Sequence, residues 1–108
     1  MAITPKQLGQ AAITTGVTTL YTVPGSTTTI LKSFDICNTG KAAIKGRLFL
    51  VPNAGSAATD TAMLYDYSIP GNGLFGWEGE HVLATGATIQ IQASATGLTI
   101  TADGVEVT

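Results

Sequence analysis

The sequence has few charged residues and few chemically reactive ones. Only 11% of its 108 residues are charged, and it holds one cysteine, Cys37, and one histidine, His81. One chain with these residues cannot build a zinc site from several such ligands or form an internal disulfide. Five Lys and Arg against seven Asp and Glu leave no basic footprint, so we do not expect nucleic acid as a partner.

Long apolar runs and a secretion signal are also missing. The longest apolar runs, such as 48–51, are far shorter than the ~20 residues that span a bilayer, so we expect no membrane partner. The opening MAITPKQLGQ has no apolar core behind a basic cluster. We therefore expect synthesis in the cytoplasm of the host cell.

Sequence motifs of catalysis are absent as well. There is no Gly-x-Ser-x-Gly, no Gly-x-x-x-x-Gly-Lys and no His-Glu-x-x-His. A Cys37–His81 pair would lack any supporting motif, and the carboxylates at 60, 66, 78 and 80 do not have the spacing of a calcium loop. We predict no catalytic residue, no cofactor and no metal, and expect that the protein is not an enzyme.

The residues that are abundant favour strands and tight turns. The chain is 44% hydrophobic, holds 13 glycines, and about one residue in six is threonine. Turn signals recur every eight to twelve residues or so, a spacing typical of an all-β sandwich or barrel. They include Pro24-Gly25-Ser26, Asn38-Thr39-Gly40, Pro52-Asn53-Ala54-Gly55, Pro70-Gly71-Asn72-Gly73 and Asp103-Gly104.

Apolar residues alternate with period two between these turns. We expect about eight short antiparallel strands, at Gln10–Thr15, Val17–Val23, Thr29–Cys37, Ile44–Val51, Ala62–Ile69, Leu74–Trp77, Ile89–Ser94 and Leu98–Val107. The prediction is a single all-β sandwich over 10–108, either immunoglobulin-like or jelly-roll. Residues 1–9 are polar enough to form an N-terminal arm outside it.

The last strand changes phase at Asp103-Gly104. Leu98, Ile100 and Ala102 alternate in one register, whereas Val105 and Val107 fall in the other. A shift of one residue reverses the face to which side chains point, so either a β-bulge or a tight hairpin lies there. We favour the bulge, because a hairpin would leave only four residues for its second strand, although Asp-Gly is also a strong hairpin signal.

Four apolar side chains are candidate partner contacts. Phe49 and Val51 share a strand face with Lys45 and Arg47, which indicates an outer face of mixed character. Trp77, with Phe75 on the same strand face, lies among glycines and acidic residues instead of inside an apolar run. Large aromatics commonly mark interfaces, although a sandwich this small also needs them in its core. The loop Asn53–Asp60, rich in small residues, is the expected mobile segment.

A series of ordered strings resembles small β-rich proteins encoded by tailed bacteriophages. The similarity covers most of the chain from Leu20 onward, and its elements are strand and turn signatures. They are Leu20-Tyr21-Thr22-Val23-Pro24, Thr29-Ile30-Leu31-Lys32-Ser33, Cys37-Asn38-Thr39, Ser68-Ile69-Pro70-Gly71-Asn72-Gly73, Leu83-Ala84-Thr85-Gly86, Ile89-Gln90-Ile91-Gln92-Ala93-Ser94-Ala95 and Gly104-Val105-Glu106-Val107.

The resemblance implies a virion structural protein. Because the chain has no coiled coil or long fibre region, we expect a capsid decoration protein that binds the major capsid protein or other virion proteins and reinforces the head. We also expect a homo-oligomer, for which a trimer on a lattice symmetry axis is one arrangement. The alternative is a tail or fibre component, such as a receptor-binding module. A host-type adhesion or carbohydrate-binding domain is disfavoured by the absence of a secretion signal.

Overall fold

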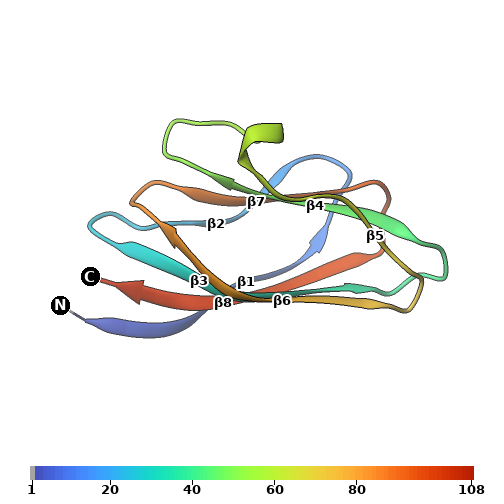
Figure 1. Ribbon diagram of the computed structural model, residues 1–108, viewed down its shortest axis with the longest axis horizontal. Helices are drawn as coiled ribbons and strands as arrows, with labels where there is room; N and C mark the ends of the chain where they lie inside the picture. Colours follow the sequence, from blue (N-terminus) through green and yellow to red (C-terminus); the bar gives the residue numbers. More distant parts are fainter. Residues whose placement is uncertain (1) are drawn as a thin grey trace.

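Eight strands and one short 3₁₀ helix form the part of the chain that the computed structural model describes, residues 2–108 (Figure 1). Turn residues separate the strands, and apolar side chains alternate along them. The elements are β1 (Ile3–Ile13), β2 (Thr18–Thr22), β3 (Thr28–Asn38), β4 (Ile44–Val51), η1 (Thr59–Thr61), β5 (Ala62–Ile69), β6 (Leu74–Leu83), β7 (Thr88–Ala93) and β8 (Leu98–Val107).

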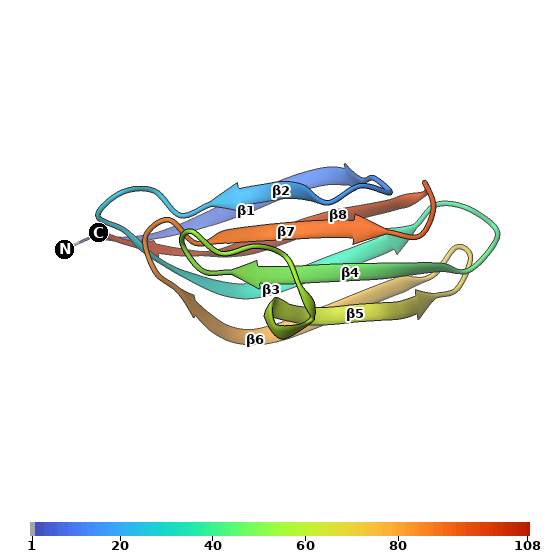
Figure 2. The same ribbon diagram turned by 90° about the horizontal axis from the view of Figure 1, so that it is seen from above.

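The strands form two four-stranded antiparallel sheets that pack face to face. The first sheet has the order β1-β8-β3-β6 and the second has the order β2-β7-β4-β5. Figure 2 looks down on the second sheet, with the first sheet behind it. The outermost strands of the sequence pair with each other, then β2 with β7, β3 with β6 and β4 with β5. The chain is therefore one long ribbon wrapped around its core, which is a jelly roll and not an immunoglobulin-like order.

The ends of two elements differ from the sequence prediction. Residues 3–9, expected as an arm, form the first part of β1 and pair with β8. They look polar in sequence because this edge strand is exposed along most of that stretch. The strand predicted at Leu74–Trp77 continues to Leu83, so His81 lies in β6.

The hydrophobic core lies between the two sheets and is built from both. Its largest fully buried side chains include Leu31, Phe34, Ile36, Leu48, Ile69, Ile89, Ile91, Leu98 and Ile100. In the described part of the chain, no buried polar side-chain atom lacks a hydrogen-bond partner. The polar groups that the fold encloses are therefore paired, as burial without a partner would cost free energy.

The phase change in the last strand has a different origin from the one expected. β8 is continuous through Asp103 and Gly104, which excludes the hairpin, and the extra residues lie in its neighbours, Leu8 in β1 and Lys32 in β3. A Cβ atom at position 104 would collide with the carbonyl oxygen of Ile30, so only glycine fits between the bulged strands. The predicted bulge is thus present at this level of the sheet, but in the strands on either side.

Because β8 is continuous through Gly104, Glu106 faces the interior of the sandwich. Tyr21 of β2 crosses from the second sheet and donates a hydrogen bond of 2.5 Å to Glu106 Oε2. The buried Thr29 hydroxyl lies 2.7 Å from the Tyr21 oxygen, and Lys6 Nζ is 3.4 Å from Glu106 Oε2. Burial and the neighbouring carboxylate raise the pKa of Tyr21 to about 12. The tyrosine hydrogen bond, and then Lys6, lower the pKa of Glu106.

Asn38 stabilises the end of the sandwich opposite to Glu106 through buried hydrogen bonds. Its side chain is fully buried and donates to the carbonyl oxygens of Ala42, at 2.8 Å, and Ile69, at 3.0 Å. Its Oδ1 accepts a hydrogen bond of 2.9 Å from the Gly40 amide. The turn after β3 and the end of β5 are therefore linked by one side chain, which supplies hydrogen-bond partners to two of their backbone carbonyls.

Alkaline pH should destabilise the fold through Tyr21. Because its pKa in the folded protein is about 12, against 10.0 for an ordinary tyrosine, the folded state holds this proton more tightly. The resulting stability is fully present below pH 10 and is lost as the pH rises to about 12. Urea unfolding between pH 8 and 12 should show a smaller loss for Tyr21→Phe than for the wild type. Equal losses would contradict the assignment.

Replacing Asn38 with alanine should lower the free energy of unfolding by about 2 kcal/mol or more, because two carbonyls and an amide lose a buried partner. Gln10→Ala, on the exposed side of β1, is the control and should change stability by less than about 0.5 kcal/mol. Chemical denaturation of both variants measures this difference. A small effect for Asn38→Ala would mean that water replaces the side chain.

Candidate interaction surface

Two of the predicted partner contacts, Phe49 and Val51, are buried within the chain. Only 3% and 2% of their surfaces are exposed. Phe49 lies opposite Gln90 on the outer face of the second sheet, so the core does not cover it. The segment between β4 and β5 folds back over that face, and η1 packs against β4 (Figure 1). The prediction is corrected for these two residues, because a loop of the same chain occupies the surface that was assigned to a partner.

The other two candidates, Trp77 and Phe75, close the open side of the sandwich. Both lie on β6 and are partly buried against the core. Trp77 stacks with Phe34 and with His81, at centroid distances of 5.5 and 5.3 Å. Phe75 contacts Tyr67 of the second sheet at 4.6 Å. These rings are thus engaged inside the chain, and their contact with a partner stays a prediction.

Apolar side chains gather at one end of the outer face of the first sheet. Strand register brings Pro5, Val105, Ile30 and Val82 into a single row across the four strands. Ile3 and Val107 lie beside each other in the adjacent row. Ile3 and Val82 are 65% and 70% exposed. We call this set the apolar band: Ile3, Pro5, Ile30, Val82, Val105 and Val107.

Carboxylates follow the apolar band on the same face. We call them the acidic band: Asp35, Glu78, Glu80 and Asp103. The register puts Asp103, Ser33 and Glu78 in one row and Asp35 in the next. The band thus holds four of the chain's seven acidic residues. Three of the four are exposed and Asp103 is partly buried, so the band is accessible to solvent.

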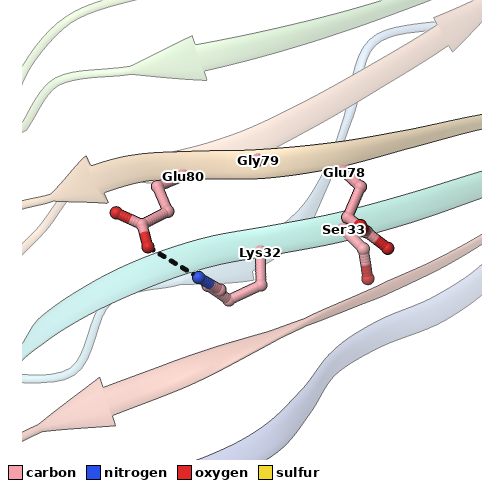
Figure 3. A pocket seen from close by; sticks show the side chains of 5 residues that line it. All are labelled: Lys32, Ser33, Glu78, Gly79 and Glu80. Carbon is pink, nitrogen blue, oxygen red and sulfur yellow. Dashed lines mark hydrogen bonds and ion pairs between the residues drawn. The ribbon is translucent and has the colours of Figure 1, made fainter.

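Lys32 is the cation within the acidic band, and the bulge in β3 presents it. Lys32, Ser33, Glu78, Gly79 and Glu80 line a shallow hollow of about 450 Å³ (Figure 3). Lys32 Nζ lies 2.7 Å from Glu80 Oε1, and this pairing lowers the pKa of Glu80. Because both side chains are well exposed, the pair adds little to stability.

The outer face of the second sheet differs in charge from the acidic band, because its strands carry the cations Arg47 and Lys45. Arg47 binds Asp66 through two hydrogen bonds, of 2.6 and 3.1 Å, and its guanidinium lies 4.2 Å from the centre of the Tyr65 ring. The hydrogen bonds from Arg47 lower the pKa of Asp66. Asp66 has a positive φ of 51° at a register shift between β4 and β5, so the ion pair holds an uncommon backbone conformation. The exposed Lys45 on this face adds a positive charge.

The potentially reactive side chains are not brought together. Cys37 pairs with Leu74, and His81 pairs with Leu31, which is six positions from Cys37 along β3, or roughly 20 Å of strand. Within residues 2–108, no three His, Cys, Asp or Glu side chains are grouped in a way that could hold a metal ion. Nor does that part of the chain contain a helix with the length and apolar character needed to cross a membrane.

Comparisons with known proteins identify no family. No family model matches the chain, and no curated protein matches it. A solved structure described as "Structure of infectious bursal disease virus Gx strain" is similar over 97% of this chain, with a TM-score of 0.43 and 10% sequence identity. The aligned part is 30% of that longer chain. A likeness this distant does not bear on function.

Sequence reasoning missed the apolar band because its members come from four strands. Ile3 and Pro5 were placed in an arm, and Val82 lies beyond the strand predicted at Leu74–Trp77. The one available signal was the phase change that sets Val105 and Val107 apart from Leu98, Ile100 and Ala102. It correctly marks a change of face, and the residues it marks point outward.

Truncating Phe49 tests whether the loop covers it. We expect Phe49→Ala to lower the free energy of unfolding by about 3 kcal/mol or more, as for a buried aromatic residue. Leu74→Ala, at a position that is 68% exposed, should change it by less than about 0.5 kcal/mol. Denaturant titration gives both values. A Phe49→Ala variant as stable as the wild type would show that the side chain is free for a partner.

Proposed function

We propose that the chain is a structural protein of a virus particle that acts by binding other proteins, and that it decorates the capsid. The resemblance to β-rich virion proteins of tailed phages supports the viral setting. The residues of that resemblance lie in structural positions. For example, Gly71 has no room for a Cβ atom beneath the Lys41 carbonyl, and the Asn72 amide donates to the Gly40 oxygen. The string Ser68–Gly73 thus closes one end of the sandwich.

The observation that carries the proposal is the outer face of the first sheet. Exposed Ile3 and Val82 lie together there with partly buried Ile30, Val105 and Val107, and a contiguous apolar set rimmed by polar residues is often an interaction site. With 11% charged residues, the chain gains little solubility elsewhere to offset this exposure. An accessible apolar area beside a charged one is a common form of protein-binding surface.

Binding without catalysis fits the arrangement of side chains. A nucleophile needs a base within hydrogen-bond reach, and the cysteine and the histidine lie far apart. The hollow beside Lys32 and Glu80 is open, and its ion pair is solvated, so it offers no site that excludes water. We therefore propose that the protein is not an enzyme and uses no cofactor or metal.

Attachment to the head would repeat one contact many times. Each copy adds a small stabilisation, and the sum over a symmetric shell reinforces the particle even when a single contact is weak. A homo-oligomer, including the trimer, would raise the number of contacts per attached unit further. This is the role of a decoration protein, whose partner is the major capsid protein or another protein of the shell.

Locating the chain in the particle tests the proposal. Cryo-electron microscopy of the virus that encodes it should show density for this jelly roll in many symmetry-related copies on the outside of the head. Density confined to the tail would contradict the decoration role and would favour the tail or fibre alternative. In that case, binding of the isolated protein to host cells would be the next measurement.

A further inference from the structure

We infer that the outer face of the first sheet is the docking face, and that its occupant is a protein surface with lysine or arginine side chains beside exposed apolar ones. This inference rests on the proposed function and specifies the chemistry of the partner. The apolar band would lie against the apolar part of that surface, and the acidic band against its basic part. In the proposed setting the occupant is the outer surface of the capsid shell.

The charge on this face specifies the partner. Four carboxylates share the face with Lys32, which is already paired with Glu80. Asp35 and Glu78 are exposed on neighbouring strands. A partner with basic side chains at these positions would be attracted before contact and oriented by the asymmetry between the two bands. An acidic partner would be repelled.

A second copy of the chain fits this face poorly. A twofold axis that passes through the centre of the face along the strands sets the acidic band of one copy against the acidic band of the other, which is unfavourable. An axis that runs across the strands sets each acidic band against the other copy's apolar band and buries carboxylates without partners, which is also unfavourable. If the axis passes through the apolar band, the overlap is about 19 Å by 13 Å, or about 250 Å² per copy, at usual strand dimensions. That area is far below the roughly 800 Å² per partner of a stable interface.

The full face has a suitable size for a single partner. Four strands at the usual spacing give a width of about 19 Å, and the ten residues of β8 give a length of about 33 Å. The resulting area, on the order of 600 Å², corresponds to about 1,200 Å² buried in total, which is the lower end of specific interfaces. On the second sheet, by contrast, the segment that contains η1 covers the part of the outer face around Phe49 and Val51.

The test measures binding of purified variants to particles of the encoding virus that were prepared without this protein. Val82→Ser removes an exposed member of the apolar band, and Val17→Ser is its control, at an exposed position in the turn between β1 and β2. Glu78→Lys reverses a charge in the acidic band, and Asp60→Lys makes the same change on the exposed η1. Co-sedimentation gives the dissociation constant for each.

We expect binding about tenfold weaker for Val82→Ser and for Glu78→Lys, with both controls equal to the wild type. Higher salt should weaken wild-type binding, since the attraction is partly between charges. Thermal unfolding checks that each variant is folded, and Ile3→Ser replaces Val82→Ser if that variant is not. Wild-type binding that none of the changes weakens would overturn the docking face alone. Failure of the wild type to bind would overturn the proposed function and this inference with it.

Self-association is a separate outcome of the same set of variants. Sedimentation velocity should show that any oligomer of the free protein is retained in Val82→Ser and Glu78→Lys. An oligomer that these two changes abolish, while Val17→Ser and Asp60→Lys retain it, would make a second copy the occupant of this face and would overturn the inference.

Discussion

Burial of alternate side chains between two sheets holds this molecule together, and the rest of the structure follows from that requirement. A strand can meet it only if its apolar residues keep to one side. Several strands break the alternation and are corrected by extra residues, among them Leu8 in β1, Leu20 in β2, Lys32 in β3 and Asp66 in β5. These corrections return the following residues to the core; Leu8 is itself buried, whereas Lys32 and Asp66 present charged side chains to solvent. The ion pairs of Lys32 and Arg47, on opposite faces, both occur at such points.

The two outer faces of the sandwich differ in whether their apolar side chains are covered by the chain itself. The second sheet carries large apolar side chains on its outer side, and a loop of the same molecule shields them from water. The first sheet carries most of its large outward apolar residues at one end, in the apolar band, and no loop covers that band as the segment with η1 covers Phe49. Because the polar surface is formed mostly by uncharged threonine, glutamine and serine, the uneven distribution of seven carboxylates and five cations gives each face a distinct charge. A small number of charged residues can thus orient the molecule toward a partner.

Much of the fold could be predicted from the sequence, because turn residues and period-two alternation act locally. The ranges of β4, β5 and β8 were predicted as observed, and the all-β sandwich was correct. Strand order was not predictable, because it depends on which strands pair over long distances. The same limit affects the candidate surface. Phe49 and Val51 have the pattern of exposed residues, and only the path of the next loop buries them. Nothing in the sequence links Pro5, Ile30 and Val82, and only the strand register places them in one row.

The pairing of β1 with β8 has a topological consequence. Ala2 and Thr108 exchange backbone hydrogen bonds, so residues 2 and 108 lie side by side at one corner of the sandwich (Figure 1). A short linker could join these ends, and the chain could be opened at an exposed turn elsewhere without loss of any strand pair. For the same reason the whole jelly roll could be inserted into a surface loop of another protein without separating the two sides of that loop. The fold is in this sense a unit that can be inserted into another chain, because residues 2 and 108 lie side by side.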